Sequence, residues 1–181
     1  MRAEHPDKRI RFFVQDEARV GQQGTLARVW ARTGSRHRSV RQMEYQWLYL
    51  WAAVDPLTGE SASMLTPTVN TELMNTLLDG LSGMLATDEH AILVLDNAGW
   101  HVAKALKVPG NLTLMHLPPY SPELNSSENL WHYLRSHYLS NRSFTDYQDL
   151  LHHSTAAMAK LDANTLKSVC ACPWIERAIQ T

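Results

Sequence analysis

The segment at residues 91–96 constrains the fold of this chain more than any other. Ala91 to Leu95 read AILVL, a short run without a polar residue, and Asp96 follows directly. A run of this length without alternation is typical of a strand that is covered on both faces in a parallel sheet. Ligands of open α/β sheets gather at the carboxyl ends of such strands. We therefore predict an α/β fold in which Asp96 lies at the functional edge of the sheet.

The hydrophobic pattern predicts further strands and helices around this run. Strands are expected over residues 10–15, 26–31, 46–54, 61–66 and 112–117, and residues 55–59 (DPLTG) are typical of a turn. Apolar residues at helical spacing predict a helix capped by Asn70 or Thr71 and another over residues 125–138, with a shorter one over residues 100–107. Ser143 is expected to cap a further helix, with Asp146 at its third position. Residues 162–181 are expected to form a docked C-terminal tail.

Length and composition indicate one domain. A chain of 181 residues with 44% hydrophobic content can bury one full core. Cys170 and Cys172 are spaced for neither a zinc knuckle nor a disulfide framework, so we interpret them as reduced structural thiols. No stretch reaches the roughly 18 apolar residues of a membrane span. These features predict a soluble, cytoplasmic protein without a membrane partner.

Positive charge is concentrated in residues 18–42. This segment carries six arginines and no acid, so it has a charge of +6, whereas the remainder of the chain has −7. Such basic density favours contact with nucleic acid, because each neutralised phosphate releases a condensed counterion. A solvated arginine-rich hairpin is the alternative. We interpret the segment as a basic insertion that follows DNA phosphates, with these candidate contacts: Arg28, Arg32, Arg36, Arg38 and Arg41.

Two more acids stand at the boundaries of predicted elements. Asp16 follows the strand expected over residues 10–15, and Glu128 opens the helix expected over residues 125–138. If Asp16, Asp96 and Glu128 converge, their oxygens suit Mg²⁺ or Mn²⁺, and two such ions can clamp the attacking and leaving oxygens of a phosphodiester. Asp16 has an alternative, because Glu17 could be the inward carboxylate instead. Glu128 also has one, because it follows Asn125 by three residues, as in a capping box.

Three segments, QDEAR, LVLDNAGWH and LPPYSPELNSSENLW, carry a family resemblance in this order. They resemble the signature segments of DDE transposases of the mariner superfamily, in the bacterial insertion-sequence branch. The resemblance spans about residues 9–160 and includes ARVWARTGSR and AAVDPLTGE. It implies a ribonuclease H-like fold, with a mixed five-stranded sheet flanked by helices. It also implies a catalytic, metal-binding triad of Asp16, Asp96 and Glu128. Within this hypothesis Asn97, His101 and Asn125 are auxiliary candidates, of which Asn97 and His101 would orient water or the scissile phosphate. A hydrogen-bonded structural role is the alternative for His101.

The resemblance implies a reaction and partners as well. Two Mg²⁺ ions, replaceable by Mn²⁺, would support hydrolysis at transposon ends, and the exposed 3′-hydroxyl would then attack target DNA at a TA dinucleotide. Relatives commonly act as dimers on paired ends, without a covalent protein–DNA intermediate. They also begin with helix-turn-helix modules, which are absent from this chain, so a separate helix-turn-helix protein from an upstream frame is an expected partner.

One departure from the family pattern lies beside the predicted glutamate. Asn125-Ser126-Ser127-Glu128 stands where relatives have Asn-Pro-Ile/Val-Glu, and we expect the helix geometry to survive. Two alternatives to an active transposase stay open. One is a catalytically silent remnant that binds DNA or a partner. The other is a ribonuclease H or Holliday-junction nuclease, which the PPYSPELN segment disfavours.

Overall fold

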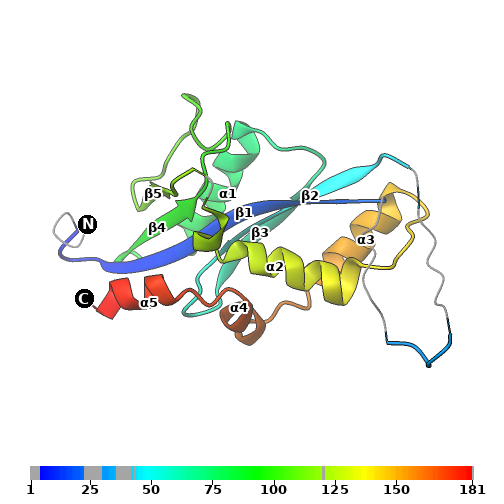
Figure 1. The fold of residues 1–181 in the computed structure, drawn as a ribbon. Coiled ribbons are helices and arrows are strands. Elements are labelled where there is room, and N and C mark those ends of the chain that lie inside the picture. The colour runs from blue at the N-terminus through cyan, green and yellow to red at the C-terminus, as the bar shows by residue number, and fades with distance from the viewer. Residues whose placement is uncertain (1–4, 23–29, 36–41, 43, 120, 181) are drawn as a thin grey trace.

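A mixed five-stranded sheet forms the centre of the molecule (Figure 1). The computed structural model describes residues 5–22, 30–35, 42, 44–119 and 121–180. Among these residues the strands are β1 (Arg9–Gly21), β2 (Trp47–Val54), β3 (Ser61–Thr66), β4 (Glu89–Leu95) and β5 (Leu112–His116). Their order is β3-β2-β1-β4-β5. The strands β1, β4 and β5 run parallel to one another, whereas β2 is antiparallel to both β1 and β3.

Helices cover both faces of this sheet (Figure 1). The helix α1 (Thr71–Met84) packs on one face, in a cluster with Phe13 and Trp51. The opposite face holds α2 (Ser127–Leu134), α3 (Tyr147–Met158), α4 (Ala163–Val169) and α5 (Pro173–Gln180). A 3₁₀ turn, η1 (Pro122–Leu124), precedes α2, and a π-helical turn, η2 (Arg135–Leu139), continues it. The predicted fold class, an α/β structure with a mixed five-stranded sheet flanked by helices, is therefore confirmed.

The strand β1 is longer than predicted. It continues to Gly21, so Asp16 lies within the strand and not at its end. The reason is a change of neighbour along the strand. Residues Arg9 to Val14 pair with β4, while Val14 to Gly21 pair with β2, which keeps the strand extended after β4 has ended. Asp16 nevertheless lies at a boundary, because β1 has just lost its parallel neighbour there.

Several predicted elements agree with the structure. Asn70 caps α1 by accepting a hydrogen bond from the backbone N–H of Leu73. The turn between β2 and β3 is formed as expected, since Asp55 Oδ1 accepts hydrogen bonds from the backbone of Leu57 and Thr58.

Of the strand predicted over residues 26–31, positions 26–29 lie outside the described residues, and the last two residues are not extended in a sheet.

Other predicted elements were wrong. Residues 100–107 form turns and no helix. The helix α3 begins at Tyr147 and is capped by Asp146, not by Ser143. Gln42 binds both backbone groups of buried Phe144, which lies between Ser143 and Asp146, and this contact holds Phe144 outside the helix.

The C-terminal residues form two helices that enter the core. Leu166 of α4 and Ile175 of α5 belong to the same apolar cluster as α2. Cys170 and Cys172 are buried free thiols between them, as the sequence predicted. The region predicted as a docked tail is thus part of the layer that supports α2. Within the described part of the chain, no helix is long and apolar enough to cross a membrane.

Candidate active site

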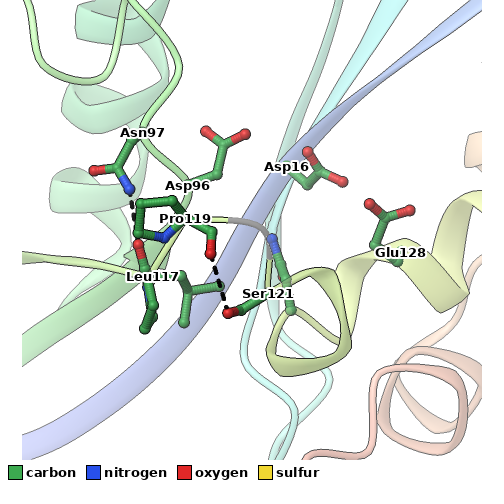
Figure 2. A pocket seen from close by; sticks show the side chains of 9 residues that line it. Asp16, Asp96, Asn97, Leu117, Pro119, Ser121 and Glu128 are labelled. Atoms are coloured by element: carbon green, nitrogen blue, oxygen red, sulfur yellow. Dashed lines mark hydrogen bonds between the residues drawn. The ribbon is translucent and has the colours of Figure 1, made fainter.

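The three predicted acids line one cavity of about 290 Å³. Asp16 comes from β1, Asp96 follows β4, and Glu128 lies in the first turn of α2. Figure 2 shows the three side chains, which come from three different elements, around this cavity. The rest of the lining is formed by the loop after β5 and two amide side chains: Asn97, Leu117, Pro118, Pro119, Ser121 and Asn125.

Strand register brings Asp16 and Asp96 side by side. The last pair between the parallel strands β1 and β4 joins Val14 and Val94, and each aspartate lies two residues beyond its valine. Neighbouring strands are about 4.8 Å apart, so Asp16, within β1, lies near the level at which the chain leaves β4 at Asp96. Asp16 also shares its face of β1 with Val14, which packs in the α2 cluster.

The helix α2 adds Glu128 from the same face of the sheet. Trp131 is buried, and its indole Nε1 donates a 2.9 Å hydrogen bond to Asp16 Oδ2. Glu128 precedes Trp131 by three residues, and residues at this spacing are neighbours on a helix surface. The indole contact therefore fixes the position of α2 along β1 and directs Glu128 toward the cavity.

The environment of Asp16 disfavours its charged form. Burial raises the pKa of this carboxyl, and the charges of Glu17 and Glu128 act in the same direction. Hydrogen bonds from the Glu17 backbone and the Trp131 indole oppose these effects, and the resulting pKa is about 7. The effect of Glu128 on Asp16 is the repulsion expected between carboxylates that share a cavity without a cation.

Asp96 and His101 form a second arrangement at the edge of the cavity. Asp96 Oδ1 lies 2.7 Å from His101 Nδ1 and accepts a hydrogen bond from the backbone of Ala98. The contact with His101 is the main cause that lowers the pKa of Asp96. Burial opposes charge on His101, but its contacts with Asp96 and Glu17 raise the pKa of the imidazole to about 9. His101 is therefore charged at neutral pH and donates hydrogen bonds from both ring nitrogens.

The donor set of the cavity fits a hard divalent cation. Carboxylate oxygens are the ligands that Mg²⁺ and Mn²⁺ prefer. Among the described residues, Asp96 Oδ2 and the Glu128 carboxylate accept no hydrogen bond, so these oxygens are available. The same residues contain no group of three acidic, His or Cys side chains that is already spaced to hold an ion. The fit thus depends on the shared cavity and the type of donor.

The two auxiliary amides bind backbone around the cavity. Asn97 donates to the carbonyl oxygen of Leu117, which joins the exits of β4 and β5. Asn125 is buried, donates to the carbonyl oxygen of Gln15 and accepts from the backbone N–H of Ser127. The capping-box interpretation of Glu128 is wrong, because the N-cap of α2 is Ser126 and not Asn125, and Ser126 makes no side-chain cap hydrogen bond. The helix begins at Ser127, so its geometry survives the Ser126-Ser127 departure as expected.

The predicted DNA-contacting arginines fall largely outside the described residues, namely Arg28, Arg36, Arg38 and Arg41. Arg32 is described and exposed in a loop, and it does not line the cavity.

Two side chains near the acids make contacts that the sequence reasoning did not predict. Glu17 binds His101 from the opposite face of β1, and Trp131 anchors Asp16. Alternation along a strand could have separated Asp16 from Glu17, since successive side chains point to opposite faces.

The sequence comparisons identify the family. The chain belongs to the DDE superfamily endonucleases, whose family model matches residues 11–151. It is also 48% identical over 115 residues to the protein named "Uncharacterized protein y4pE/y4sA" of Sinorhizobium fredii. The aligned segment covers 64% of this chain and 85% of that relative. The resemblance to DDE enzymes inferred from the sequence is therefore confirmed.

Several complexes of Mos1, a mariner transposase, are among the solved structures that match. A pre-cleavage Mos1 transpososome aligns with 88% of this chain at a TM-score of 0.65 and 18% identity. A Mos1 mariner paired end complex with Mn aligns over the same share at a TM-score of 0.64 and 20% identity. This chain spans about half the length of those chains, 52% and 51% respectively. The likeness confirms the ribonuclease H-like fold.

Proposed function

We propose that this chain is the catalytic domain of a transposase that cleaves DNA with the help of divalent metal ions. The observation that carries the proposal is the convergence of Asp16, Asp96 and Glu128, from three separate elements, on one cavity. Membership of the DDE superfamily endonucleases supports it. The Mos1 complexes with Mn and with Mg support the choice of metal.

The three acids would hold the divalent ions in the proposed mechanism. Asp16 of β1, Asp96 after β4 and Glu128 of α2 would provide the carboxylate ligands. Bound ions would supply an activated water and neutralise charge on the scissile phosphate. The protein itself fixes the ligands: Trp131 holds Asp16, and His101 holds one oxygen of Asp96.

We extend the proposal to the second step and to the DNA partners. The product 3′-hydroxyl would be transferred to target DNA at TA, and a homodimer would hold the paired ends, with a separate helix-turn-helix protein recognising the terminal repeats. The similar Mos1 structures, which include a strand transfer complex and a paired-end complex, support the strand-transfer step and the pairing of ends. The arginines of residues 18–42, including exposed Arg32, would follow the phosphate backbone.

A nicking assay tests the proposal. The protein is incubated with a labelled duplex that carries its element's terminal repeats, with Mg²⁺ or Mn²⁺ and then with EDTA. We expect metal-dependent nicking by the wild type and background levels for Asp96→Asn and Glu128→Gln. Asp79→Asn is the matched control, because Asp79 is an exposed acid on α1, on the other face of the sheet, and should leave nicking unchanged.

The same assay separates the alternatives. Duplex binding without nicking by the wild type would indicate a catalytically silent remnant. Equal nicking by the wild type and both variants would remove Asp96 and Glu128 from the proposed site. Joining of the nicked strand to a second, TA-containing duplex would support strand transfer, and cleavage without joining would limit the activity to that of an endonuclease.

A further inference from the structure

A buried carboxylate lies directly behind the candidate active site. The Glu17 side chain is only 8% exposed, and its Oε1 is surrounded by three donors. Gln15 Nε2 lies at 2.9 Å, Trp100 Nε1 at 3.1 Å and His101 Nε2 at 3.1 Å. These donors come from β1 itself and from the turn that follows β4. Glu17 therefore binds that turn to the central strand.

The His101 imidazole connects Glu17 with Asp96 at the edge of the cavity. The His101 side chain is fully buried and lies between two carboxylates. Its Nε2 faces Glu17, and its Nδ1 lies 2.7 Å from Asp96 Oδ1. Trp100 packs edge-on against the same ring, with 5.7 Å between ring centroids. With both nitrogens engaged and no exposed surface, the imidazole has a single orientation.

This orientation decides which Asp96 oxygen faces the cavity. The backbone N–H of Ala98 and His101 both engage Oδ1. The Asp96 side chain is 58% exposed and follows the end of β4, so packing restrains its rotation less than that of a buried carboxylate. The imidazole contact is the main side-chain restraint on this carboxylate in the described part of the chain. It leaves Oδ2 free for a ligand role.

We propose that Glu17 is a positioning residue that acts through His101 to orient Asp96 for cation binding. Adjacent residues of β1 then have different roles: Asp16 faces the cavity on one side of the sheet, and Glu17 anchors the imidazole on the other. The inference rests on the proposed function, because it assigns Asp96 to the metal site. Partners that orient metal ligands typically change metal affinity about 10- to 100-fold when they are removed.

Direct Mn²⁺ titration tests this proposal without a DNA substrate. Electron paramagnetic resonance of free Mn²⁺ gives the dissociation constant of the wild type, Glu17→Gln and Glu89→Gln. Glu89 is a matched control, because it is also a buried glutamate that accepts hydrogen bonds, at the opposite end of β4. We expect Mn²⁺ binding to weaken at least about 10-fold in Glu17→Gln and to stay within twofold in Glu89→Gln. Equal affinity in the wild type and Glu17→Gln would overturn the proposal.

A second variant covers the case in which Glu17→Gln fails to fold. In His101→Gln, the amide can still reach Glu17 but loses the contact with Asp96, so Mn²⁺ should bind as weakly as in Glu17→Gln. The double variant should bind no more weakly than His101→Gln alone, because Glu17 acts through the imidazole. Additive losses, or His101→Gln with wild-type affinity, would contradict this route.

The test also distinguishes this proposal from the proposed function. If the wild type does not bind Mn²⁺, the metal site itself is wrong and both proposals fail. If the wild type binds Mn²⁺ and nicks DNA while Glu17→Gln matches it in both assays, only the positioning role fails. A purely structural role would lower the melting temperature of both glutamate variants and leave Mn²⁺ affinity unchanged.

Discussion

Substituting Gly59 with alanine should destabilise the protein strongly. Gly59 ends the turn between β2 and β3, and its φ angle is +76°. A Cβ built there would lie 2.1 Å from the carbonyl oxygen of Ala163, the first residue of α4. The overlap is with backbone, so no side-chain rotation relieves it. The substitution therefore tests how the C-terminal helices pack on the sheet.

The two costs can be estimated separately. A left-handed backbone conformation costs an L-residue about 1–2 kcal/mol. Forcing an extra carbon into a closed contact costs about 1–3 kcal/mol. The sum is about 2–5 kcal/mol, which in a domain of this size lowers the melting temperature by about 4–20 °C.

Urea and thermal denaturation measure this loss, with Gly80→Ala as the matched control. Gly80 lies within α1, and a Cβ there meets nothing within 4 Å. Alanine should stabilise that helix by about 0.5–1 kcal/mol. The two Gly→Ala substitutions should therefore change the stability of the protein in opposite directions. If Gly59→Ala changed the melting temperature by less than about 2 °C, the packing of α4 against the turn would be wrong.

Two further substitutions address the layer that carries Glu128. Trp131→Phe keeps an aromatic ring but removes the hydrogen bond to Asp16. We therefore expect the free energy of unfolding in urea to fall by about 1.5–3 kcal/mol and Mn²⁺ to bind more weakly by electron paramagnetic resonance. If neither value changed, the indole would have no role in positioning Asp16. Ser127→Ala should raise stability by about 1 kcal/mol, seen as a higher melting temperature, because Ser127 Oγ is fully buried without a hydrogen-bond partner in the described structure. A lower melting temperature would show that this hydroxyl has a partner.

Much of the sheet could be predicted because its signals are local. The run AILVL needs both faces covered, and all seven residues of β4 are buried. The turn at Asp55 and the cap at Asn70 depend on side chains that bind backbone two or three residues away. Such features are visible in the sequence, because the interacting groups are neighbours in the chain.

The errors arose where distant partners decide between local candidates. Both Ser143 and Asp146 can cap a helix, and Gln42 excludes the first by binding the backbone of Phe144. Asn125 could have formed a capping box with Glu128, but its amide nitrogen is held by the carbonyl oxygen of Gln15 on β1, and its Oδ1 accepts from the backbone N–H of Ser127. Neither contact could be found from spacing along the chain.

The sequence by itself predicted the α/β class from its burial periodicity, and the DDE-like segments implied the mixed sheet and the three candidate acids. Only the tertiary structure decided how these acids meet. The register of β1 and β4 sets Asp16 level with Asp96, and packing of α2 on the same face adds Glu128. It also placed Glu17 behind Asp96, through an imidazole 84 residues away in the chain. The physical reason is that strand pairing and helix packing join residues without regard to their separation in sequence.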